Sequence, residues 1–250
     1  YDENYDKIPT AALTMEDAMM LGRIHEREQK ITLKLQMEAK TVGDRWSRNI
    51  ISEIKGHEYP SEIVVVGAHI DSWDVGQGAH DDGGGCIASW EVLRLIKTLG
   101  LKPKRTIRCV LWTNEENGLR GSNSYRDMHL DELDNHIVAI ESDAGVFAPQ
   151  GFGFSGNKDA RKIIENIHEL LKPIKANQIT DWGRAPDVAT LNDEGIPVMS
   201  LNVDLSKYFW YHHSAADTFD KVDFHDFNKC VAAMTIMAFV IADLDRPLPR

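Results

Sequence analysis

The spacing of apolar side chains divides the chain into two regions. In residues 30–38, apolar and polar residues alternate from Ile31 to Met37, and residues 48–55 show a second pattern of this exposed type. A period of two predicts strands with one face in water. From residue 62 onward the apolar positions form short continuous runs separated by segments with helical spacing, which is typical of buried strands that alternate with helices.

The predicted elements define a fold class. The first helix falls within residues 9–26, where Thr14 and Asp17 form an imperfect capping box ahead of an apolar stripe. Further along, strands are predicted at 62–68, 106–113, 136–141, 151–155 and 196–203, and helices at 85–99, 118–129, 158–172, 187–194 and 226–245. This alternation predicts an α/β fold with a mixed, largely parallel central sheet and helices on both of its faces.

The composition is that of an ordinary globular chain, with 42% hydrophobic and 27% charged residues in a length of 250. Its apolar runs are too short to predict a membrane span. The net charge of −11 argues against nucleic acid as a partner, because no basic patch is present to neutralise phosphates. The three cysteines are widely spaced in apolar patterns, so we expect buried free thiols at Cys86, Cys109 and Cys230.

The first residues are typical of the middle of a protein. The chain begins at Tyr1 without a methionine or a signal peptide, so we interpret it as a fragment or a processed chain. A shift in composition near residue 43 is the one candidate boundary, and it predicts a small module at 1–43 followed by a main domain at 44–250.

Candidate ligand side chains follow the predicted strands one after another. His69 and Asp71 come directly after the strand at 62–68, and Asp81 and Asp82 follow in the next turn. The later strands are followed by Glu115 and Glu116, by Asp143, and, after the aromatic run YFWY, by His212 and His213. Functional groups in open α/β sheets gather beyond the carboxyl ends of the strands, so we expect these side chains to meet at one edge of the sheet.

Imidazole and carboxylate groups in this number suit a pair of metal ions, and the mix of nitrogen and oxygen favours zinc without excluding manganese or cobalt. Adjacent Glu115 and Glu116 allow one carboxylate to coordinate while its neighbour stays off the metal as a general base. Asp71 is placed to hold the imidazole of His69. The glycine triplet after Asp82 lacks the Lys and Ser/Thr of a phosphate-binding loop, so we expect it to allow close backbone approach and to start a helix.

Five motifs in this order, HxD, DDGGG, NEE, ESDAG and HHSxxDT, resemble those of the dizinc aminopeptidase and glutamate carboxypeptidase family, and the similarity runs through nearly the whole chain. The resemblance implies the zinc-dependent exopeptidase fold with two Zn²⁺ per chain. His69, Asp81 and Asp143 would hold one ion. Asp81, Glu116 and His213 would hold the other, with Asp81 bridging the two.

The same resemblance implies a reaction and an organisation. Glu115 would act as general base and acid on a bridging hydroxide that cleaves short peptides, such as dipeptides, from one end. Residues 1–43 would be the C-terminal remnant of an inserted protease-associated-type domain, and residues 44–250 the dizinc catalytic domain. A homodimer in a secreted or lysosomal location, with short peptides as substrates, is also implied.

Four residues have open roles, and for one of them, Asp82, the sequence gives no assignment. His80 stands before the double Asp, where a residue that is not a ligand is expected, so it is either an extra ligand or a rim residue. His212 precedes His213 where better-known relatives carry a Tyr that stabilises the developing oxyanion, which makes His212 a candidate for that catalytic role. Asp187 lies in the family's Asp-x(7)-Gly-Ile-Pro pattern, either near the substrate pocket or as a helix cap.

Three alternatives to an active exopeptidase stay open from the sequence. A catalytically silent, peptidase-like binding ectodomain would hold no metal, and a glutaminyl-cyclase-like acyltransferase would hold a single zinc. A fragment that lacks upstream strands would be inactive even if its parent protein is an enzyme. The intact set of ligands and the intact base favour the exopeptidase, but they identify neither the preferred substrate side chain nor the end from which a peptide is attacked.

Overall fold

The computed structural model describes residues 4–40 and 42–250 and divides the chain into two compact units, Tyr1–Trp46 and Ser47–Arg250. The division lies close to the predicted boundary at residue 43. That the first unit is the end of an inserted domain stays a prediction.

The first unit contains one helix, α1 (Met15–Glu26), among its described residues. Thr14 caps this helix as predicted, since its hydroxyl accepts a hydrogen bond from the backbone N–H of Asp17 (3.1 Å). The strand predicted at 30–38 is wrong, because no strand forms there and its side chains are exposed. A strand is stabilised by hydrogen bonds to a neighbouring strand, and the described part of this unit contains no strand with which residues 30–38 could pair.

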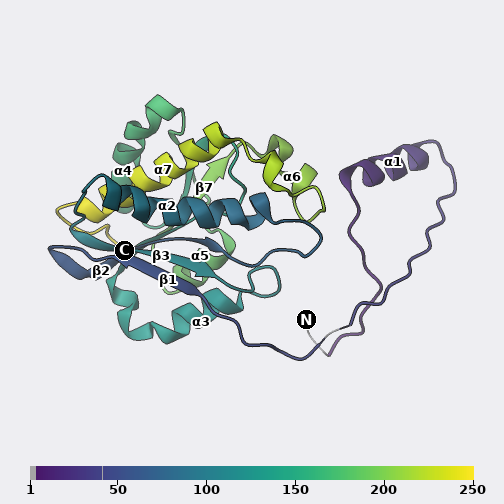
Figure 1. The fold of residues 1–250 in the computed structure, drawn as a ribbon, viewed down its shortest axis with the longest axis horizontal. Coiled ribbons are helices and arrows are strands. Elements are labelled where there is room, and N and C mark those ends of the chain that lie inside the picture. The colour runs from purple at the N-terminus through teal and green to yellow at the C-terminus, as the bar shows by residue number, and fades with distance from the viewer. Residues whose placement is uncertain (1–3, 41) are drawn as a thin grey trace. The chain divides into compact units, whose positions relative to one another are not determined.

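The second unit is built on a seven-stranded sheet with the order β1-β3-β2-β4-β7-β5-β6 (Figure 1). The strands are β1 (Ile50–Ile54), β2 (Tyr59–His69), β3 (Arg105–Trp112), β4 (His136–Glu141), β5 (Pro149–Ser155), β6 (Gln178–Thr180) and β7 (Val198–Val203). β3, β2, β4 and β7 run parallel to one another, whereas β1 and β5 pair antiparallel with β3 and β7. The predicted mixed, largely parallel sheet is confirmed.

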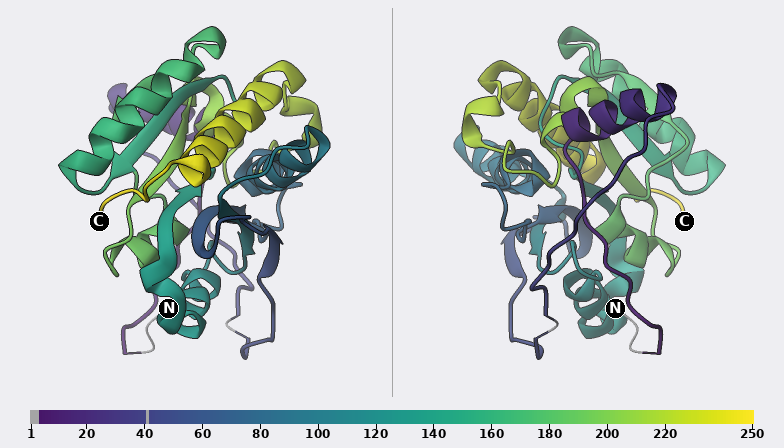
Figure 2. Two further views of the ribbon diagram at one scale, coloured as in Figure 1. Left: turned by 90° about the vertical axis from the view of Figure 1, so that its left-hand side faces the viewer. Right: turned by 90° about the vertical axis from the view of Figure 1, so that its right-hand side faces the viewer.

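Helices cover both faces of the sheet, as predicted. On one face α2 (Gly84–Thr98) and α7 (Phe224–Asp243) lie side by side, and α4 (Lys158–Ile167) packs into the same core (Figures 1 and 2). On the other face lie α3 (Arg120–Met128) and α5 (Pro186–Asn192). The remaining helical pieces are short: α6 (Tyr208–Tyr211), a π-type turn at Ala79–Gly83, and 3₁₀ turns at Leu130–Asn135, His168–Ile174, Leu205–Lys207 and Phe219–Lys221.

The alternation of side chains along a strand explains how one apolar run serves both layers. In β2, Val64 and Val66 belong to the core under α2 and α7, whereas Ile63 and Val65 belong to the core under α3 and α5. A strand with helices on both faces therefore favours apolar residues at successive positions rather than at alternate ones. This is why β2 lacks the two-residue periodicity of an exposed strand.

α7 is the one helix in the described residues that is long and apolar enough to cross a membrane by length and composition. It packs against the sheet, and Met234, Met237, Ala238 and Ile241 are fully buried there. A core helix passes the same test of length and composition, so the apolar character of α7 is accounted for by the core.

A buried polar network surrounds His136, the first residue of β4. Its Nδ1–H donates to the carbonyl of Glu132 (2.9 Å), and its Nε2 accepts from the Tyr125 hydroxyl (2.9 Å). That hydroxyl in turn accepts a hydrogen bond from Arg108 (2.9 Å). Both ring nitrogens are satisfied only while the imidazole is neutral. Burial lowers the pKa of His136 to about 4.

We expect this network to make the domain sensitive to acid. An unfolded histidine titrates near pH 6.5, so His136 adds no pH dependence above that value. Below it, the unfolded state binds the extra proton, and stability falls by up to about 3 kcal/mol between pH 6.5 and 4. His136→Gln should be less stable than wild type at neutral pH but should lose this acid-dependent component. Chemical denaturation across this range measures both, with half-exposed His57→Gln as control. An unchanged pH slope in His136→Gln would contradict the assignment.

Candidate metal centre

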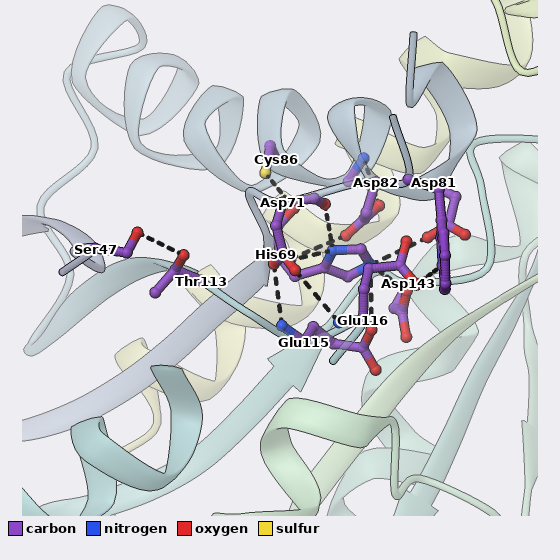
Figure 3. A network of polar contacts seen from close by, with 12 residues as sticks. Ser47, His69, Asp71, Asp81, Asp82, Cys86, Thr113, Glu115, Glu116 and Asp143 are labelled. Atoms are coloured by element: carbon purple, nitrogen blue, oxygen red, sulfur yellow. Dashed lines mark hydrogen bonds and ion pairs between the residues drawn. The ribbon is translucent and has the colours of Figure 1, made fainter. Parts of the chain in front are cut away.

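The carboxyl ends of β2, β3, β4 and β7 meet at one edge of the sheet, because these strands are parallel neighbours. His69 is the last residue of β2, Glu115 and Glu116 follow β3, and Asp143 follows β4 (Figure 3). The chain after β7 passes through α6 to the paired histidines. The structure thus brings together side chains that are up to about 140 residues apart in sequence.

His69 faces two carboxylates. Its Nε2 lies 3.1 Å from Asp81 Oδ1 and 3.1 Å from Asp143 Oδ1, and all three side chains are largely buried. Its Nδ1–H donates to the backbone carbonyl of Asp71 (2.8 Å), which fixes the ring with Nε2 toward the carboxylates. Ligand atoms at roughly 2.0–2.2 Å from one shared zinc ion lie about this far apart.

His213 faces the other oxygen of the same aspartate. Its Nε2 lies 3.2 Å from Asp81 Oδ2 and 2.9 Å from Glu116 Oε2. Asp81 therefore contacts one histidine through each carboxylate oxygen. His213 has a left-handed backbone conformation (φ 55°), which is uncommon for a residue with a Cβ and is found disproportionately at functional sites.

The cluster carries more negative charge than the protein itself neutralises. Asp81 Oδ2 and Glu116 Oε1 are buried and accept no hydrogen bond from the described residues. Burial, and next the charge of Asp81, raises the pKa of Glu116 to about 7. Burial alone would lower the pKa of His69, but hydrogen bonds to Asp143 and Asp81 hold it above its usual range. Orphaned buried oxygens beside crowded carboxylates indicate a site that a cation completes.

Asp71 has a different task from the one predicted. Its carboxylate is 3.8 Å from His69 Nδ1 and instead accepts hydrogen bonds from the backbone N–H groups of Glu115 (3.0 Å) and Glu116 (3.3 Å). It is the main-chain carbonyl of Asp71 that holds the imidazole. Asn114, with φ 63°, opens the turn that points both N–H groups at Asp71. The Asp71 side chain therefore fixes the turn that presents the two glutamates.

Glu115 lies beside the ligand groups rather than within them. Its Oε2 is 3.9 Å from His69 Nε2, and it belongs to none of the three groups of described residues whose ligand atoms all approach one another within 4.8 Å. Burial, and next the charge of Asp143, raises the pKa of Glu115 to about 7. A carboxyl group with such a pKa can accept and return a proton near neutral pH.

A cavity of about 270 Å³ opens over these groups. Its lining comprises Asp81, Glu115, Glu116, Asp143, Pro186, Tyr208, His212 and His213. Within it, His212 Nε2 lies 3.4 Å from Asp81 Oδ2, and the His212 ring stacks on that of His213 at 3.5 Å. Burial lowers the pKa of His212. Two imidazoles thus reach one oxygen, and the choice of His213 over His212 as ligand stays a prediction.

Asp82 ties the loop to the sheet and to α2. Its Oδ2 accepts from the backbone N–H of His69 (3.1 Å), and its Oδ1 accepts from that of Gly85 (3.1 Å) in the first turn of α2. A Cβ at Gly85 would lie 2.2 Å from both Asp82 Oδ1 and the carbonyl of Ser142. The glycine triplet therefore permits close backbone approach and begins a helix, as predicted.

His80 is neither an extra ligand nor a rim residue. Its side chain is buried and stacks on Phe147, with ring centroids 4.0 Å apart and an interplanar angle of 5°. Its Nδ1 accepts from the backbone N–H of Val146 (3.3 Å), and its Nε2–H donates to the carbonyl of Lys221 (3.3 Å). Both nitrogens are used, so His80 is a packing residue that joins three loops beside the site.

Asp187 is fully buried in the first turn of α5, and burial raises its pKa to about 7. It does not cap the helix, since Ala185 occupies the N-cap position. The free backbone N–H of Val188 is instead satisfied by Glu141 Oε2 (2.9 Å), from the end of β4. The neighbouring Pro186, not Asp187, lines the cavity.

A family model matches most of the second unit. The model of peptidase family M28 matches residues 49–238. The chain belongs to peptidase family M28. Carboxypeptidase Q of Xenopus laevis is 46% identical over 250 residues, which cover 100% of this chain and 53% of that relative. This M28 chain therefore spans about half the length of the curated relatives it matches.

Solved structures show the same M28 fold. A peptidase M28 precursor from Shewanella amazonensis SB2B is 36% identical with a TM-score of 0.91, and the match covers 100% of this chain and 57% of that one. A zinc aminopeptidase from Bacillus subtilis shares the fold with a TM-score of 0.66 and 22% identity, over 79% of this chain and 50% of that one. The predicted resemblance to the family is confirmed.

Two residues of this M28 site carry contacts that sequence reasoning missed. Asp217 is buried and accepts from the backbone N–H groups of His80 (2.8 Å) and Asp81 (3.1 Å), so it binds the loop of the paired histidines to the ligand loop. Trp73 donates to a side-chain oxygen of Glu116 (2.7 Å). The Asp of HHSxxDT marks Asp217 as part of a motif, whereas no local pattern distinguishes Trp73.

Proposed function

We propose that this chain contributes the catalytic centre of a zinc-dependent exopeptidase that hydrolyses short peptides, including dipeptides. The observation that carries the proposal is the junction at Asp81: one buried carboxylate reaches His69 through one oxygen and His213 through the other. Glu115 stands next to this junction and belongs to none of the three groups of candidate ligands among the described residues. A bridging carboxylate with a free carboxylate beside it is the arrangement that two-metal hydrolysis requires.

The donors present fit two zinc ions. Imidazole nitrogen and carboxylate oxygen are usual zinc ligands, and the orphaned Asp81 Oδ2 and Glu116 Oε1 gain a partner when a cation binds. His69, Asp81 and Asp143 would hold one ion, and Asp81 would share the other with Glu116 and His213. Two zinc ions here would polarise the scissile carbonyl and lower the pKa of water.

The chain's own residues supply the proton transfers and the shape of the site. Glu115 would take a proton from the attacking water and return it to the leaving amine, since its raised pKa suits both steps. His212, which also lines the cavity, would donate a hydrogen bond to the developing oxyanion. The cavity volume of about 270 Å³ lies just below the range of roughly 300–1,000 Å³ that is usual for small-molecule sites, which favours short peptides.

The same contacts weigh against the alternatives. A silent binding domain has no need for an ionisable Glu115 held by Asp71, and a single-zinc acyltransferase has no need for two histidines on opposite oxygens of Asp81. A homodimer in a secreted or lysosomal compartment is a further proposal, which rests on the family resemblance alone.

The protein is expected to bind two zinc ions and to hydrolyse dipeptides. Chelation should abolish hydrolysis, and two equivalents of zinc should restore it, because the two ions would both polarise the carbonyl and lower the pKa of the attacking water. Metal analysis together with assays on a dipeptide, its N-acetyl form and its C-terminal amide measures this and shows which end is recognised. A folded protein without zinc would favour the binding domain, and one zinc with cyclisation of amino-terminal glutamine would favour the acyltransferase.

A further inference from the structure

Trp73 contacts two of the proposed ligands at once. Its indole Nε1–H donates to Glu116 Oε2 (2.7 Å), and its ring lies 5.3 Å from the ring of His213, tilted by 46°. Glu116 and His213 are the two ligands proposed for the second ion alone. The Trp73 side chain therefore contacts both residues that are proposed to bind only the second ion.

The indole hydrogen bond defines the orientation of the Glu116 carboxylate. An ionised carboxylate oxygen has two lone pairs, and Trp73 takes one of those on Oε2. The same oxygen lies 2.9 Å from His213 Nε2, while Oε1 is buried and has no hydrogen-bond partner among the residues that the structure describes. Rotation of the carboxylate would break the bond to Trp73, so the indole keeps Oε2 beside His213.

Two residues of the loop between β2 and the double Asp form hydrogen bonds with Glu116. Asp71 accepts from its backbone N–H (3.3 Å), and Trp73, two residues further on, holds its side chain. Trp73 is 40% exposed and belongs to neither hydrophobic core cluster of the described residues. Its specific contacts are directed at the ligands rather than at packing.

We propose that Trp73 is a positioning residue that sets the affinity of the ion between Asp81, Glu116 and His213, independently of the ion at His69 and Asp143. The inference rests on the proposed function, because it requires two bound ions. Groups that orient metal ligands from outside typically change metal affinity by about 10–100-fold.

Trp73→Phe tests this, since it removes the N–H and keeps an aromatic ring. In competition with a chromophoric chelator, one of the two zinc ions should bind about 10–100-fold more weakly than in wild type, and the other should be unchanged. Trp90→Phe is the matched control, because Trp90 is 46% exposed and lies on α2. It should leave both affinities unchanged, and metal-free Trp73→Phe should unfold at the wild-type temperature.

A second measurement keeps the test independent of that variant's metal loading. In wild type labelled with 5-fluorotryptophan, the Trp73 ¹⁹F resonance should shift when one of the two ions binds and not when the other does. Trp73→Phe, or Trp73→Tyr should the former not fold, assigns this resonance. If Trp73→Phe binds both ions as tightly as wild type, or if the Trp73 resonance does not shift when zinc binds, the inference is overturned and the proposed function stands. A wild-type protein that binds no zinc overturns the proposed function.

Discussion

Replacing Glu115 with glutamine is expected to lower kcat for dipeptide hydrolysis by about 10²–10⁴-fold while zinc content stays at two per chain. Glutamine keeps the size of the side chain and the backbone N–H that Asp71 holds, but it cannot accept a proton. The loss should fall on kcat rather than on KM, because Glu115 belongs to none of the candidate ligand groups and is proposed to act on the reacting water. Steady-state kinetics with parallel zinc analysis measures both quantities.

The neighbouring Glu116 offers the matched comparison. Glu116→Gln changes the same atoms one residue further along the same turn, but its oxygen is 2.9 Å from His213 Nε2, so this variant should lose zinc as well as activity. A Glu115→Gln protein with full activity would show that another group moves the proton. A Glu115→Gln protein without zinc would show that Glu115 is a ligand.

The layout of the second unit could be predicted because its elements carry local signals. The continuous apolar run of β2 and the helical spacing of α2 each reflect burial that is visible in a short window. α6 and β6 were missed because they span only four and three residues, too few for any periodicity. The helix predicted at 158–172 ends at Ile167 and continues as a 3₁₀ turn that contains Pro173.

The candidate site, like the fold, could be predicted only in part. Ligand types that follow consecutive strands could be gathered from the order of the motifs, because parallel neighbours place their carboxyl ends together. The contacts that orient them could not. Asp217 reaches the backbone of His80 across 137 positions, and Asp71 turned out to hold the glutamate turn through its side chain and His69 through its carbonyl. Such partners depend on loop conformation, for which spacing carries no signal.

His80 shows most clearly that residue type alone does not identify a metal ligand. An imidazole beside two aspartates has the composition of a metal site, yet its stacking on Phe147 and its hydrogen bonds to two backbone groups turn it away from the cavity. Residue type alone therefore overestimated the number of candidate ligands. The direction of each side chain, which follows from the backbone around it, decides which of them reach the site.

Asp81→Asn is expected to remove both zinc ions and to reduce hydrolysis to below about 1% of wild type. Asparagine has the same shape, and its backbone N–H still donates to Asp217, so the loop should keep its fold. The substitution nevertheless replaces one charged oxygen by an amide group and leaves a neutral side chain between His69 and His213, each about 3 Å away. One change therefore weakens two sites, which a terminal ligand cannot do.

Asp143→Asn makes the comparison decisive. Asp143 Oδ1 lies 3.1 Å from His69 Nε2, and Asp143 shares a ligand group with His69 but not with His213, so its loss should weaken one ion and leave the second bound. Zinc per chain after dialysis against buffered metal should be near zero for Asp81→Asn and near one for Asp143→Asn. If Asp81→Asn instead kept one ion, Asp81 would be a terminal ligand. His212, which reaches the same oxygen at 3.4 Å, would then become the candidate that completes the second site.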